Sequence, residues 1–77
     1  MLEIDWDVHN GGWQKPVIRP NEPFHLDPMN ATLHYSIECF EGLKAYITDD
    51  DRLLLFRGDK NFERMNDSHR QLGFPLF

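Results

Sequence analysis

The clearest alternation of apolar and polar positions in this chain lies between residues 43 and 57. Residues Leu43–Ile47 alternate in the manner of a strand that turns one face toward a core. The run Leu53–Phe56 is apolar at every position, which is typical of an interior strand covered on both faces. Because Asp49, Asp50 and Asp51 separate the two segments, we expect a β-hairpin over residues 43–57 with the aspartates in its turn.

A helical period follows directly. Four side chains, those of Phe62, Met65, His69 and Leu72, fall on one stripe at helical spacing, which predicts a helix over residues 58–72. We expect Asp59 to cap its start, and Gly73 with Pro75 to stop it. A histidine within the stripe is expected to crowd a packed helix.

The first part of the chain is less regular. Four of the five prolines lie within residues 1–30, so extended pieces joined by turns are expected there. Asn10-Gly11-Gly12 is a turn signal that favours a short hairpin between Ile4–Val8 and Trp13–Ile18. Further on, helical spacing of apolar residues predicts one or two turns over Leu33–Phe40, ended by Gly42.

Composition narrows the function classes. Seventy-seven residues allow one small domain, and a net charge of −5 argues against generic nucleic-acid binding. The one cysteine, Cys39, cannot form an intrachain disulfide, and we interpret it as a small buried apolar residue. No apolar run reaches the length of a membrane helix and no secretory signal opens the chain, which favours a reducing compartment.

Arg64 is one candidate for binding chemistry. Helical geometry places it about 120° from the apolar stripe, and its planar guanidinium matches the oxygens of a phosphate group. The alternative is a solvated helix face on which Arg64 pairs with Asp67. No metal site is expected, because His9 and His25 lack a ligand spacing.

Two motifs in order give the chain a family resemblance. Leu33-His34-Tyr35 followed by Phe40-Glu41-Gly42-Leu43-Lys44-Ala45-Tyr46, and then Asn61-Phe62-Glu63-Arg64-Met65, resemble the signature segments of branched-chain amino-acid aminotransferases. These are class-IV (fold type IV) enzymes that use pyridoxal 5′-phosphate. The resemblance implies a mixed α+β fold and places residues 1–77 as part of an N-terminal domain, with the domain that bears the catalytic Schiff-base lysine absent.

The resemblance also implies roles for single residues. Arg64 would bind the cofactor phosphate, while Tyr35, Phe40 and Gly42 would line an apolar substrate pocket. No catalytic residue is assigned, because the lysine of this family lies elsewhere and Lys44 is interpreted as a charge at the rim of the site. The substrates would be branched-chain amino acids and 2-oxo acids, in a homodimer in the cytoplasm or the mitochondrion, without nucleic-acid or membrane partners.

Other functions stay open at this point. The chain could be a fragment that is inactive alone, or a non-catalytic dimerisation or regulatory fragment. Another class-IV activity, such as D-amino-acid transamination or aminodeoxychorismate lyase chemistry, is the second enzymatic alternative.

Overall fold

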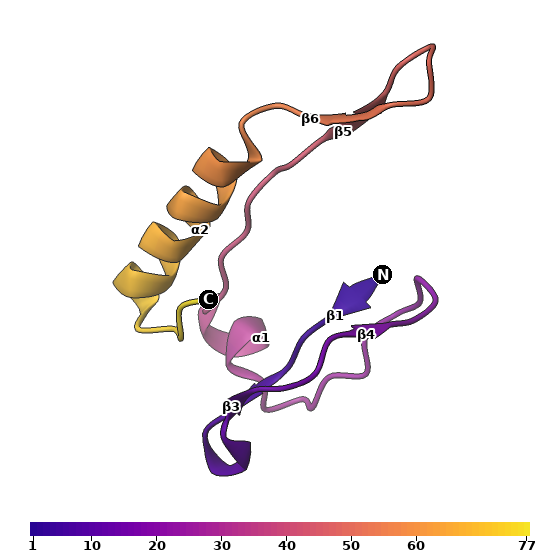
Figure 1. The fold of residues 1–77 in the computed structure, drawn as a ribbon. Coiled ribbons are helices and arrows are strands. Elements are labelled where there is room, and N and C mark those ends of the chain that lie inside the picture. Colours follow the sequence, from indigo (N-terminus) through magenta and orange to yellow (C-terminus); the bar gives the residue numbers. More distant parts are fainter. The chain divides into compact units, whose positions relative to one another are not determined.

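The computed structural model describes residues 1–77 and has a small mixed α+β structure. It contains short antiparallel hairpins and one 15-residue helix (Figure 1). The chain divides into two compact units, Met1–Asn30 and Ala31–Phe77, and each is described by itself.

The first unit is a two-stranded ribbon. Strand β1 (Leu2–Glu3) pairs antiparallel with β4 (Val17–Ile18), and β2 (Trp6–Asp7) pairs with β3 (Gly12–Trp13). A 3₁₀ turn, η1 (Val8–Asn10), joins the inner strands, and the left-handed backbone of Gly11 (φ 84°) ends that turn. The hairpin predicted around Asn10-Gly11-Gly12 is therefore confirmed.

The second unit begins with a helix shorter than expected. Helix α1 covers Ala31–Tyr35, so the prediction of a helix over Leu33–Phe40 was wrong at both ends. It stops at Ser36, whose φ of 53° is left-handed, and the Thr32 hydroxyl donates to the carbonyl of Ile37 just beyond. Gly42 does not have a positive φ and does not end the helix.

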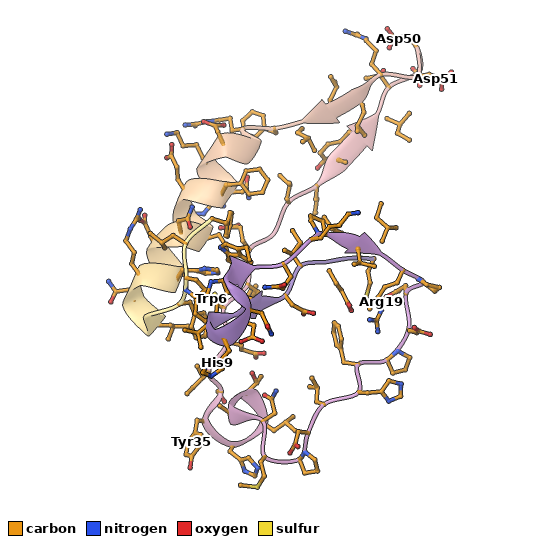
Figure 2. The ribbon with its side chains drawn as sticks, turned by 60° about the horizontal axis from the view of Figure 1, so that its bottom comes forward. Trp6, His9, Arg19, Tyr35, Asp50 and Asp51 are labelled. Carbon is orange, nitrogen blue, oxygen red and sulfur yellow. The ribbon has the colours of Figure 1, made fainter.

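The hairpin of residues 43–57 is confirmed. Strand β5 (Ala45–Ile47) pairs antiparallel with β6 (Leu53–Leu55), and the aspartates form the connecting turn. Figure 2 shows Asp50 and Asp51 at its tip. The expectation of an interior strand was wrong, because β6 has a single neighbouring strand and Leu53–Phe56 is exposed.

Helix α2 covers Gly58–Leu72, as its periodicity predicted. Asp59 lies in its first turn and is not the N-cap; that position belongs to Arg57, whose backbone is left-handed. At the other end Gly73, with φ 71°, lets its own amide and that of Phe74 bond back to the last helical carbonyls.

The residues after α2 fold back onto the helix. His69 Nδ1 lies 2.7 Å from the carbonyl oxygen of Pro75, and the rings of Phe74 and Phe77 meet the imidazole edge-on. The Asn66 amide bonds to both the N–H and the carbonyl of Phe77. His69 is consequently one of two buried residues, and it is accommodated by this returning segment rather than crowding the stripe.

No apolar side chain of the chain is fully buried. Cys39, expected to be buried, is a free thiol that is only partly covered. None of the helices combines the length and the apolar character needed to cross a bilayer.

Candidate functional site: a basic hollow beside helix α2

A two-point ion pair joins the segment before β5 to helix α2. Arg64 Nε donates to Glu41 Oε2 at 2.9 Å, and Arg64 Nη2 donates to Glu41 Oε1 at 2.7 Å. The chain between α1 and β5 runs alongside α2 in Figure 1, which brings together two residues 23 positions apart. Such a fork-to-carboxylate contact fixes the plane of the guanidinium as well as its position.

A second helix residue supports the same contact. The Asn61 side-chain amide donates to Glu41 Oε1 at 3.1 Å and to the carbonyl oxygen of Gly42 at 2.6 Å. Asn61 is buried and lies one helical turn before Arg64. The two helix residues therefore hold both the side chain of Glu41 and the backbone that follows it.

The charges of this pair reinforce each other. The hydrogen bonds from Arg64 lower the pKa of Glu41 to about 2, against the opposing effect of burial, and the Gly42 and Asn61 N–H groups lower it further. The same contact raises the pKa of Arg64. Both groups are thus ionised at neutral pH, although the Arg64 side chain is 61% exposed and that of Glu41 only 20%.

Arg64 also lines a hollow of about 700 Å³ beside α2. Four cationic side chains line it. Lys44 lies just before β5, Arg57 lies just before α2, and Lys60 and Arg64 lie within α2. Only two acidic residues, Glu63 and Asp67, line it with them, and Glu41 does not. A chain of net charge −5 therefore carries a locally positive hollow. Such a lining suits an anionic ligand, because opposite charges attract most strongly where walls exclude water.

The structure brings together some of the predicted site residues and not others. Arg64 and Gly42 both line the hollow. Tyr35 ends α1 and Phe40 lies in the segment that follows; neither lines the hollow, and they are 77% and 91% exposed. Figure 2 shows the Tyr35 side chain extending from the helix.

The alternative pairing proposed for Arg64 is not formed. Asp67 pairs with Arg70 one turn along the helix, and Arg64 takes Glu41. Sequence reasoning missed this partner, although Glu41 lies within the signature segment. No local signal in the sequence links the two residues, which are 23 positions apart.

No group of three or more histidine, cysteine or acidic residues in the chain is arranged to hold a metal ion. The cationic side chains that line the hollow are of a kind that forms charge-assisted bonds to the oxygens of anionic groups.

Comparison with known proteins finds relatives that match the sequence of the whole chain. A "Branched-chain-amino-acid aminotransferase" of Monosiga brevicollis is 48% identical over all 77 residues, which correspond to 20% of that protein. The chain is homologous to branched-chain amino-acid aminotransferases. Two Saccharomyces cerevisiae relatives of that name, one cytosolic and one mitochondrial, are 42% and 44% identical over the whole chain.

The chain spans about a fifth of the length of the curated relatives it matches. The names of the two yeast aminotransferases cover both of the compartments expected from the sequence. No protein-family model matches the chain. The homology includes the segments that carry Glu41, Gly42 and Arg64, because the alignments cover every residue.

Proposed function

We propose that this chain forms the cofactor-phosphate side of a branched-chain aminotransferase, as part of its N-terminal domain, with Arg64 as the phosphate anchor. The observation that carries the proposal is the position of Arg64 in a hollow with three further cationic side chains, on an otherwise acidic chain. The homology supports the aminotransferase part of this proposal, because the names of the relatives describe that activity.

The donor set fits the phosphate group of pyridoxal 5′-phosphate. Glu41 occupies the Nε and Nη2 atoms of Arg64 and leaves Nη1 without a protein partner. Lys44, Arg57 and Lys60 provide further N–H donors in the same lining. When bound, pyridoxal 5′-phosphate supplies the electron sink that lets an amino group move from an amino acid to a 2-oxo acid.

Three residues would contribute to selection of a branched aliphatic side chain. Tyr35 and Phe40 present exposed aromatic rings, and Gly42 lets backbone approach the ligand without a Cβ in the way. Aliphatic substrates offer no polar handle, so dry aromatic walls and shape must supply the selectivity. Neither ring lines the hollow beside α2. We therefore propose that the two rings contact the substrate in the assembled homodimer, together with residues outside α2.

A chimera tests the proposal directly. In it these 77 residues replace the matching fifth of the Monosiga aminotransferase, and transamination of leucine with 2-oxoglutarate is measured. We expect activity to be kept, and Tyr35→Ala or Phe40→Ala to raise KM for leucine more than KM for 2-oxoglutarate. Equal effects on both substrates would remove the substrate-wall role.

The same chimera separates the competing functions. A preference for D-amino acids, or lyase activity on aminodeoxychorismate, would replace the branched-chain assignment by another class-IV activity. A folded chimera that binds cofactor and transfers no amino group would favour a non-catalytic role.

A further inference from the structure

The Arg64 guanidinium has two usable edges, and the structure shows one of them occupied. The carboxylate of Glu41 takes the edge formed by Nε and Nη2. A guanidinium carries five N–H donors in a rigid plane, so three remain: two on Nη1 and one on Nη2. The remaining N–H of Nη2 and one N–H of Nη1 lie side by side along the end of the group and form a two-pronged donor for a phosphate, while the second N–H of Nη1 points toward the opposite side.

We propose that Glu41 is a positioning residue that holds the side edge of Arg64 and thereby presents its end edge to a phosphate group in the hollow. This inference rests on the proposed function and deepens it. Glu41 acts through Arg64 and not on the ligand, since Arg64 lines the hollow and Glu41 does not.

The surroundings of Glu41 favour a fixed support over a loose surface pair. Its side chain is largely covered, and four N–H donors hold it: two from Arg64, one from the Gly42 backbone and one from the Asn61 amide. Arg64, by contrast, is mostly exposed and carries several rotatable bonds. An unpaired arginine of this kind loses side-chain entropy when it binds an anion. Glu41 reduces that loss by fixing the guanidinium beforehand.

A purely electrostatic view makes the opposite prediction, and this difference makes the idea testable. A carboxylate next to an anion site repels the anion, so removing its charge should strengthen anion binding. If Glu41 instead positions Arg64, removing its charge should weaken binding. Glu63 supplies the matched control, because it lines the same hollow and pairs with Lys60 at 2.7 Å.

The experiment titrates inorganic phosphate into the full 77-residue chain, followed by ³¹P NMR. Glu41→Gln should weaken phosphate binding by roughly threefold to tenfold, the size of one ordinary hydrogen bond. Glu63→Gln should leave it unchanged or strengthen it by up to about fivefold. The double variant Glu41→Gln with Arg64→Ala should bind no worse than Arg64→Ala alone, because Glu41 acts through Arg64.

A second readout needs no ligand. The Nε–H signal of Arg64 should be shifted and protected from exchange in the unchanged chain and in Glu63→Gln, and should lose both properties in Glu41→Gln. Tighter phosphate binding by Glu41→Gln, matching Glu63→Gln, overturns the proposal, and so does an Nε–H signal that ignores Glu41.

A result against the proposed function is distinguishable from these. If the unchanged chain binds no phosphate while the Nε–H signal still depends on Glu41, the anion site is wrong and the pair is a structural tie only. If phosphate binds with Arg64 dependence and Glu41→Gln changes neither readout, the phosphate anchor stands and the positioning role falls.

Discussion

Arg57 and Arg64 line the same hollow, yet only Arg64 has an acidic partner. Arg57 lies between strand β6 and helix α2 and has a left-handed backbone. Its side chain lines the hollow from this connecting position. The two arginines therefore differ in how firmly they are held, although both can face the same anion.

The first prediction concerns Arg64 in the chimera. Arg64→Ala is expected to weaken pyridoxal 5′-phosphate binding by about tenfold to a hundredfold, the range of a charge-assisted hydrogen bond. Arg64→Lys should restore only part of this, because a single ammonium cannot reproduce a planar fork. Cofactor retention after dialysis against a series of free-cofactor concentrations measures both effects.

The control for that measurement must lie outside the hollow. From sequence alone Arg57→Ala would serve, with little loss expected, but the structure places Arg57 in the lining. Arg52 is better suited, because it lies in the hairpin turn, pairs with Asp50 at 2.7 Å and does not line the hollow. Equal cofactor affinity of Arg64→Ala and Arg52→Ala would mean that the family role does not carry over to Arg64.

The second prediction concerns the lysines. The 77-residue chain on its own should transfer no amino group from leucine to 2-oxoglutarate, because the resemblance assigns the catalytic lysine to none of its positions. Lys44 lines the hollow and is the lysine to test. Turnover by the unchanged chain that Lys44→Ala abolishes would show that Lys44 carries the chemistry after all.

The third prediction is a pH dependence of stability. The folded pKa of Glu41 is about 2, below its ordinary value of 4.5, because Arg64 bonds the charged form. A depressed carboxyl pKa stabilises the fold fully above the ordinary value, and this contribution is lost as the pH falls through the folded pKa. The chain should therefore lose helix stability as the pH falls from about 4.5 to about 2.

Glu41→Gln provides the comparison for this effect. Urea unfolding, followed by the helical circular dichroism signal, measures the free energy of unfolding of Glu41→Gln and of the unchanged chain. The difference between the two free energies should be constant above about pH 4.5 and should decrease as the pH falls from about 4.5 to about 2. Glu63→Gln, which keeps the Glu41–Arg64 pair, should retain the acid dependence of the unchanged chain. A constant difference at every pH would contradict the assigned cause.

The fourth prediction concerns association. Because no apolar side chain is fully buried, the 77 residues alone expose apolar surface on the hairpin and on α2. Contiguous surface of this kind drives association. We expect sedimentation to show self-association of the chain, or thermal unfolding to show a broad transition. A sharp, cooperative melt of a monomer would count against this expectation.

The elements that the sequence predicted correctly are those whose signal is local. The hairpin follows from alternation and three aspartates, and α2 from a stripe at helical spacing with Gly73 after it. The start of α1 and its end at Ser36 had no such signal, because a left-handed serine is set by contacts such as that of Thr32 with Ile37. The apolar pattern of β6 predicted an interior strand, but β6 pairs only with β5 and would need a second neighbouring strand to become interior.

Two residues that line the hollow, Arg64 and Gly42, were named from the sequence, and the partner of Arg64 was not. Arg64 followed from the motif and from its angle to the stripe. Its pairing with Glu41 could not be predicted, because no periodicity links residues 23 positions apart. Distant pairs of this kind depend on the path of the chain, which here returns along α2.

The segment that folds back after Gly73 divides helix α2 into two unlike halves. Around His69 the chain's own Pro75 carbonyl and two phenylalanine rings cover the imidazole, which therefore has little free surface to offer. Around Phe62, next to the hairpin, the stripe stays open. A neighbouring polypeptide that covers this helix would therefore contact the half around Phe62. The fluorescence of a tryptophan introduced by Phe62→Trp would change when that polypeptide binds, whereas the signal of the His69 imidazole would not.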